Sequence, residues 1–152
     1  MSRIFELYLA DERDARGICE DPECDTKEIW VAGFDEARQL SLLSLFMEIP
    51  PSPKYLSFEF YRLYHQYFRL LYPSEFGAET FVSAFPTDLV QALTGLTADA
   101  ISELAATWMN KVPKLEKLEW TLVQFEDLLS TVCRTCEMAS DQQKLVLFRC
   151  CL

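Results

Sequence analysis

The sequence contains few of the residues and patterns that define a nucleotide-binding or catalytic site. Only four glycines and one histidine occur among its 152 residues. Neither of the glycine-rich phosphate-binding patterns, G-x-x-x-x-G-K-[ST] and G-x-G-x-x-G, is present, and four scattered glycines do not build such a loop. We therefore expect no nucleotide-dependent catalysis, and the sequence predicts no cofactor and no enzyme activity.

The sequence also lacks a basic surplus and a long hydrophobic run. Its formal net charge is −10, which repels nucleic-acid backbones and anionic membrane surfaces. The charged residues 11–14 come before any apolar stretch is long enough for a signal-peptide core or a membrane span. These features predict a soluble, cytoplasmic protein that binds neither nucleic acid nor membrane. If it has a macromolecular partner, a basic protein fits best.

The six cysteines do not form a pattern that defines a metal centre. Cys133 and Cys136 have the spacing of metal ligands, and with Cys19 and Cys24 they could supply four thiolates to zinc. However, Cys133 and Cys136 fall late inside a predicted helix, where neither a zinc knuckle nor a redox-active pair is normally found. The sequence predicts reduced, mostly buried thiols and no metal, with a cysteine-based metal-binding or redox sensor as the alternative.

Apolar residues make up half of the chain, and aromatic residues are frequent. This composition is typical of a packed core rather than of a disordered chain. A chain of this length corresponds to about one domain, and no linker or repeat divides it. We therefore expect a single globular domain over residues 1–152.

Short apolar segments at both ends of the chain and near residue 30 predict a small sheet. Residues 4–9 and 144–152 are rich in apolar side chains, and residues 28–34 combine β-branched and aromatic residues before a glycine. An apolar segment left free in water would promote aggregation, so the C-terminal segment is expected to pair as a strand.

Helical periodicity covers most of the remaining sequence. The predicted helices are 35–46 capped by Asp35, 55–71 opened by Ser52 and Pro53, 86–95, 97–113 capped by Thr97, and 118–138. Residues 74–84 give a weaker signal, because they contain a glycine. The fold class is therefore predicted as α+β and predominantly helical, with about five to six helices and a small sheet of N-terminal and C-terminal strands. An all-α fold is the alternative.

Residues 11–25 form a strongly acidic segment that is predicted to be a solvated loop. Gly17 and Pro22 interrupt it, and the alternating pattern of a calcium-binding loop is missing. Its carboxylates are candidate binding residues for a basic partner: Asp11, Glu12, Asp14, Glu20, Asp21, Glu23 and Asp25.

The predicted helix 55–71 is apolar on most of its surface, so it belongs in the middle of the fold or against a partner. Tyr61 and Tyr64 are candidate interface anchors, because tyrosine is enriched at interfaces. Core packing is the competing interpretation. The only histidine, His65, is interpreted as a partly buried side chain hydrogen-bonded to a neighbour rather than as a general base.

Taken together, these features favour a non-enzymatic protein-binding protein. The leading hypothesis is an immunity-type inhibitor that neutralises a basic bacterial toxin or nuclease by occlusion, with acidic side chains steering the encounter and aromatic anchors slowing release. The alternative is a structural or regulatory homodimer that uses the helix 55–71 as its interface.

Overall fold

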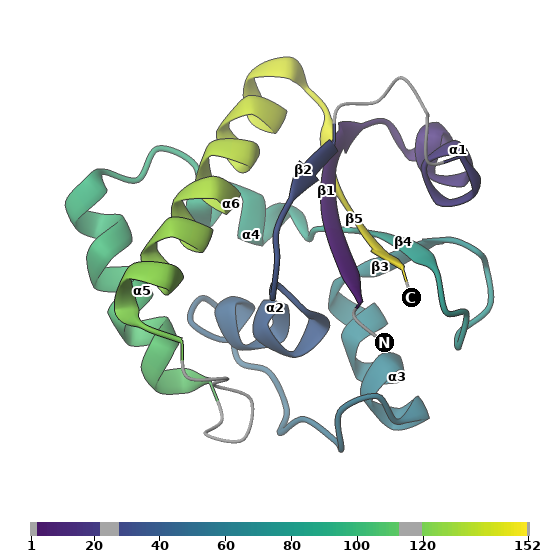
Figure 1. Cartoon of the computed structure of the whole chain (residues 1–152), viewed down its shortest axis with the longest axis horizontal. Helices are drawn as coiled ribbons and strands as arrows, with labels where there is room; N and C mark the ends of the chain where they lie inside the picture. The colour runs from purple at the N-terminus through teal and green to yellow at the C-terminus, as the bar shows by residue number, and fades with distance from the viewer. Residues whose placement is uncertain (1–2, 22–27, 113–119, 152) are drawn as a thin grey trace.

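The structure is a computed structural model that describes residues 3–21, 28–112 and 120–151. A five-stranded antiparallel sheet lies at its centre (Figure 1). The order of its strands is β2 (Glu28–Trp30), β1 (Ile4–Ala10), β5 (Leu145–Cys151), β4 (Phe81–Ala84) and β3 (Arg69–Tyr72). Ile4 pairs with Cys151, so the two ends of the chain lie side by side in this sheet.

The chain also forms six α-helices and one 3-10 turn within the described residues. They are a 3-10 turn (Glu12–Asp14), α1 (Ala15–Glu20), α2 (Glu36–Leu43), α3 (Phe58–Tyr67), α4 (Thr87–Leu93), α5 (Ala98–Lys111) and α6 (Leu122–Gln142). None of the helices within the described ranges is long and apolar enough to cross a membrane.

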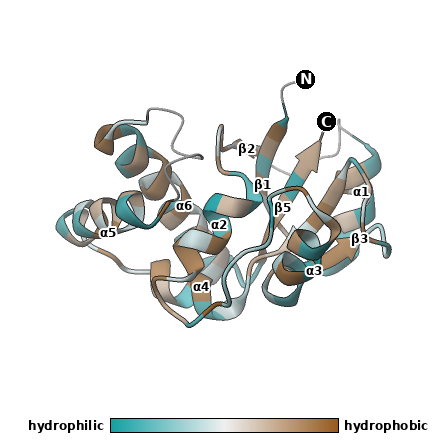
Figure 2. Cartoon of the chain, turned by 90° about the horizontal axis from the view of Figure 1, so that it is seen from below, coloured by the Kyte–Doolittle hydropathy of each residue, from teal (hydrophilic) through white to brown (hydrophobic). Residues whose placement is uncertain are grey.

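Side chains that alternate along the strands divide the core between the two faces of the sheet. On β1, Phe5 and Leu7 belong to the larger cluster, which α2 to α6 cover. Tyr8 and Ala10 point to the opposite face, where Ile18 of α1 packs in a smaller cluster. Figure 2 shows α1 on one side of the strands and α5 and α6 on the other.

The α+β, predominantly helical fold is confirmed, and the all-α alternative is wrong. The strands expected at both ends of the chain are β1 and β5, and they pair along their whole length. The predicted caps are also confirmed: the Asp35 carboxylate accepts a hydrogen bond from the Arg38 N–H at 2.9 Å, and the Thr97 hydroxyl accepts one from the Ala100 N–H at 3.2 Å.

The predicted helix 55–71 is wrong at both ends. It begins at Phe58, because the Ser57 hydroxyl accepts a hydrogen bond from the Phe60 N–H at 3.1 Å and caps the first turn. It ends before Arg69, where the chain enters β3 and pairs with β4. β4 lies inside the weakly predicted segment 74–84 and in turn pairs with β5, which is remote in sequence. Such long-range pairing outweighs local helical periodicity.

The predicted loop over residues 11–25 is also wrong in its first part. Residues 12–20 are helical, because Ala15 and Ile18 bury their side chains against the sheet and Arg16 pairs with Glu20 at 3.1 Å one turn later. Residues 22–27, which include the predicted binding residues Glu23 and Asp25, lie outside the described residues.

Candidate functional site

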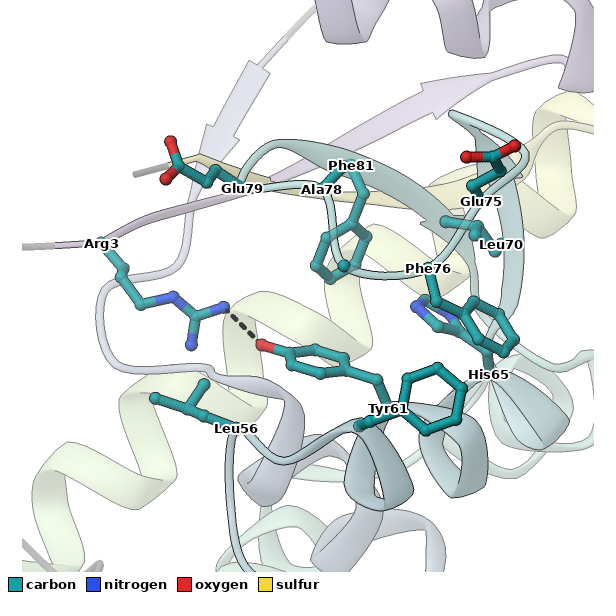
Figure 3. A pocket seen from close by; sticks show the side chains of 12 residues that line it. Arg3, Leu56, Tyr61, His65, Leu70, Glu75, Phe76, Ala78, Glu79 and Phe81 are labelled. Atoms are coloured by element: carbon teal, nitrogen blue, oxygen red, sulfur yellow. Dashed lines mark hydrogen bonds between the residues drawn. The ribbon is translucent and has the colours of Figure 1, made fainter.

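A recess of about 370 Å³ lies between α3 and the loop that joins β3 to β4 (Figure 3). Most of its wall is apolar or aromatic: Leu56, Phe58, Tyr61, Leu70, Phe76 and Phe81. Its polar lining consists of Arg3, His65, Glu75 and Glu79. We call this hollow the aromatic recess. Its volume falls within the range of ligand pockets, about 300–1,000 Å³.

Three separate segments of the chain supply the walls of the aromatic recess. Tyr61 and His65 are four residues apart on α3, so both side chains project from the same face of that helix. The loop between β3 and β4 carries Glu75, Phe76 and Glu79 over this face. Arg3 directly precedes β1, and its side chain lies at the other end of the recess.

Arg3 is held by a buried carboxylate. Its two terminal nitrogens hydrogen-bond both oxygens of Glu36, and the Glu36 side chain is fully buried at the start of α2. The same nitrogens lie 2.6 Å from the Tyr55 hydroxyl and 3.1 Å from the Tyr61 hydroxyl. Each hydroxyl also donates to Glu36 at 3.0 Å. The charge of Arg3 is therefore offset inside the fold.

These contacts favour one ionisation state for each group. Burial works against the charge of Arg3, but the Glu36 carboxylate outweighs it and raises the pKa of the guanidinium above its ordinary value. Burial and the same carboxylate raise the pKa values of the Tyr55 and Tyr61 hydroxyls. Both tyrosines thus stay neutral hydrogen-bond donors at physiological pH.

His65 lies on the inner wall and is oriented by the backbone. Its Nδ1 atom is 2.9 Å from the carbonyl oxygen of Phe68. A carbonyl oxygen only accepts hydrogen bonds, so Nδ1 carries the proton and Nε2 of the neutral ring is an acceptor. Burial lowers the pKa of His65, which favours this neutral form. The predicted hydrogen bond to a neighbour is confirmed.

The mouth of the aromatic recess exposes several large apolar side chains. Leu56 is 54 % exposed, Phe58 is 62 % exposed and Phe76 is 43 % exposed. They are three of the seven exposed large hydrophobic side chains in the described part of the chain. Such residues are ordinary when scattered, but a cluster of them beside a hollow is typical of a binding surface.

The predicted acidic binding residues lie elsewhere, around α1. Asp11 pairs with Lys144 at 2.9 Å, and Glu12 pairs with Arg69 at 2.8 Å. These cations lower the pKa values of both carboxyl groups. Glu20 accepts a hydrogen bond from the Tyr72 hydroxyl and pairs with Arg16, and these two contacts lower its pKa.

Basic neighbours offset much of the negative charge of this segment. The carboxylates described there are Asp11, Glu12, Asp14, Glu20 and Asp21, and the cations beside them are Arg13, Arg16, Arg69 and Lys144. Five negative and four positive charges leave a net charge of −1. Asp14 also serves a structural role, because its carboxylate accepts a hydrogen bond from the Asp11 N–H at 2.9 Å.

The structure separates the two tyrosines that were predicted as anchors. Tyr61 lines the aromatic recess. Tyr64 is completely buried, and its hydroxyl bonds Gln39 at 2.7 Å and lies 3.2 Å from the Ser83 hydroxyl. Tyr64 therefore belongs to the core rather than to the surface. Neither tyrosine lies with the acidic segment, which packs on the opposite face of the sheet.

The cysteines within the described residues do not converge on one site. Cys133 and Cys136 are buried in the larger core cluster, and burial raises their pKa values to about 11 and about 12. Cys19 packs with the smaller cluster on the other face of the sheet, and Cys24 lies outside the described residues. Over residues 3–21, 28–112 and 120–151, no three His, Cys, Asp or Glu side chains lie close enough together to hold a metal ion.

Most of the aromatic recess has no local signal in the sequence. Arg3 and Glu36 are far apart in the chain, and no local pattern indicates that they meet. Phe76 and Glu79 lie in a segment with weak periodicity, so nothing singled them out. The clustering of aromatic residues between 55 and 68 is the sequence signal nearest to the recess, and Tyr61 of this cluster lines it.

Comparison with known proteins adds no family assignment: no family model, no curated protein and no solved structure matches the chain.

Proposed function

We propose that this chain is a non-enzymatic protein-binding protein that occludes a basic partner, as an immunity-type inhibitor of a bacterial toxin or nuclease would. The aromatic recess and its mouth form the docking surface. The observation that carries the proposal is the grouping of exposed apolar side chains with two carboxylates, those of Glu75 and Glu79, around one hollow. Aromatic anchors in pockets supply much of the energy of protein interfaces.

The charge distribution supports a basic partner. Within α4, α5 and α6, the acidic residues are Asp88, Asp99, Glu103, Glu126, Asp127, Glu137 and Asp141. The basic residues of these helices are only Lys111 and Arg134. Seven negative and two positive charges leave a net charge of −5, whereas the described charged groups around α1, which do not include Glu23 and Asp25, leave −1. A field of this sign attracts a basic protein and raises its association rate.

Self-association through the same surface is the second candidate, because exposed Phe58 and Phe76 would also suit a homodimer. A two-fold interface buries the same patch of both copies, so the carboxylates of Glu75 and Glu79 from both copies would be collected in one interface. Like charges in close contact disfavour this arrangement. Sedimentation equilibrium tests it: a monomer at high protein concentration removes the homodimer.

A peptide-display selection tests the docking surface with random peptides in place of the natural partner. The whole chain is used as bait for the peptide library, and the selected peptides are then tested against the Phe58→Ala/Phe76→Ala variant. We expect peptides rich in Lys and Arg whose binding to this variant falls at least about tenfold, which is about 1.4 kcal/mol. Selected peptides that are acidic, or that bind the variant equally well, would refute the proposal.

The biological side of the proposal has its own test. If a toxin-like reading frame lies beside the gene, its product is co-expressed with this chain in a sensitive host. We expect protection by the natural chain and reduced protection by the Phe58→Ala/Phe76→Ala variant at equal protein level. Equal protection by both chains would mean that inhibition does not depend on the aromatic recess.

A further inference from the structure

The polar lining of the aromatic recess includes several hydrogen-bond acceptors, two of them exposed carboxylates at its rim. Nε2 of His65 is an acceptor, because Nδ1 donates to the Phe68 carbonyl oxygen. Glu75 and Glu79 add two carboxylates from the loop between β3 and β4. A group with several N–H donors would complement this set.

Arg3 is the only lysine or arginine among the described lining residues, and its donors are already engaged. The terminal nitrogens of Arg3 already hydrogen-bond Glu36, the two tyrosine hydroxyls and the Cys150 sulfur, which lies at 2.9 Å. The positive charge of Arg3 is matched by the buried negative charge of Glu36. With Arg3 matched by Glu36, the carboxylates of Glu75 and Glu79 leave the described lining of the recess with a negative net charge.

Aromatic rings surround the same space. The His65 ring stacks on Phe76 with centroids 5.3 Å apart, and Phe76 lies 6.1 Å from Phe58. Deeper in the recess, the rings of Tyr61 and Phe81 meet at 80° with centroids 6.1 Å apart. Ring faces attract cations through their quadrupole, and an aliphatic stem packs well between them.

We propose that the aromatic recess binds the side chain of a lysine or arginine, that is, an alkyl chain ending in an ammonium or guanidinium group. The alkyl stem packs between the rings of Tyr61, Phe76 and Phe81, and the cationic head is directed toward Glu75 and Nε2 of His65. This inference rests on the proposed function, since it specifies which side chain of a basic partner enters the hollow. A neutral apolar side chain would make neither an ionic contact with Glu75 nor a hydrogen bond with Nε2 of His65.

NMR titration of the whole chain with blocked single amino acids tests the inference. The probes are the N-acetyl methylamides of lysine and arginine, with norleucine as the neutral analogue that has the four side-chain carbons of lysine without its ammonium group, and glutamate as the anion. We expect the two cationic probes to shift the backbone amides of Phe58, Phe76 and Gly77 with millimolar dissociation constants. Norleucine should bind at least about fivefold more weakly, and glutamate should produce no saturable shift.

A charge-neutralised variant separates the role of the carboxylates from that of the rings. In Glu75→Gln/Glu79→Gln, lysine should bind no better than norleucine, whereas Asp99→Asn/Glu103→Gln on α5 should bind lysine like the natural chain. Norleucine binding as strongly as lysine would overturn the inference and leave the proposed function standing. If none of the probes binds but display-selected peptides still bind at the recess, the inference is likewise overturned and the proposed function stands. If the selected peptides also avoid the recess, both proposals fail.

Discussion

Arg3 and Glu36 form a bidentate ion pair that links the start of the first strand to the first turn of α2. The Glu36 side chain is fully buried, and that of Arg3 is only 16 % exposed. Tyr55 and Tyr61 complete the hydrogen bonding of the carboxylate. A buried charge is tolerated only with such partners, so this pair fixes how α2, α3 and the N-terminal strand meet beneath the aromatic recess.

Replacing Glu36 by Gln should destabilise the fold strongly. The change keeps the shape of the side chain but leaves the Arg3 charge without its counter-charge, which costs about 3 kcal/mol. Urea denaturation followed by circular dichroism measures this as a lower transition midpoint. The matched control is Glu48→Gln on the surface, which should change the free energy of unfolding by less than about 0.5 kcal/mol. A loss below about 1 kcal/mol in Glu36→Gln would contradict the central role of the pair.

The stability of the protein should depend on the ionisation of His65. Burial lowers the pKa of His65 in the folded state, so the unfolded chain binds a proton more readily. The stabilisation is therefore complete above the unfolded pKa, near 6.5, and is lost as the pH falls through the folded pKa. Its size is about 1.4 kcal/mol for each unit by which the two pKa values differ.

The variant His65→Asn isolates this dependence. Its amide can still donate to the Phe68 carbonyl oxygen but does not titrate. Between about pH 7.5 and about pH 5.5, the natural chain should lose more stability than the variant in urea denaturation. Parallel pH profiles for the two proteins would show that His65 titrates normally in the folded state.

Gly33 should be intolerant of any side chain. Its φ angle is +77°, and an added Cβ atom would lie 2.2 Å from the ring of Trp120. That ring also lies against Arg38, whose guanidinium carbon is 4.9 Å from the ring centroid. Gly95 has a similar φ angle of +80° but open space around it, so Gly95→Ala measures the backbone strain alone.

Thermal or urea denaturation of the two alanine variants separates the cost of the positive φ angle from the cost of the steric clash with Trp120. Gly95→Ala should cost about 1–2 kcal/mol, which is the penalty of a left-handed backbone for an L-residue. Gly33→Ala should cost at least about 1 kcal/mol more, because the Trp120 ring must move. Equal losses would mean that the contact with Trp120 does not constrain the loop after β2.

Thiol labelling should distinguish two groups of cysteines. Cys133, Cys136 and Cys150 are buried, and their pKa values are raised to about 11, about 12 and about 12, mainly by burial. Cys19 and Cys151 are half-buried. Because the thiolate is the reactive form, iodoacetamide at about pH 8 should label the second group much faster in the native protein. Peptide mapping by mass spectrometry measures each site, and rapid labelling of the buried group would contradict the packing of α6 and β5.

The sequence predicts those helices that are determined by residues close together in the chain. The Asp35 and Thr97 caps and the long helix that became α6 were all visible, because capping residues and helical periodicity lie close together in the chain. The pairing of β1 with β5 was also expected, since both ends of the chain are apolar and need burial.

The sequence could not indicate elements that depend on distant partners. β3 pairs with β4, and β4 also pairs with the remote C-terminal strand β5. Nothing within residues 69–84 indicates this second pairing. In the same way, nothing in the sequence near residues 11–25 indicates that Arg69 pairs with Glu12 and Lys144 with Asp11. The aromatic recess depends on Arg3, α3 and the loop between β3 and β4, which meet only in three dimensions.

The most direct test compares two surfaces with one basic ligand, a Lys- and Arg-rich peptide obtained by display selection on the natural chain. Isothermal titration measures its affinity for Glu75→Gln/Glu79→Gln and for Asp11→Asn/Glu12→Gln/Glu20→Gln. We expect the first variant to bind at least about tenfold more weakly, or about 1.4 kcal/mol, and the second to differ less than about threefold. A large loss in the second variant, with the first unchanged, would contradict the assignment of the aromatic recess as the docking surface.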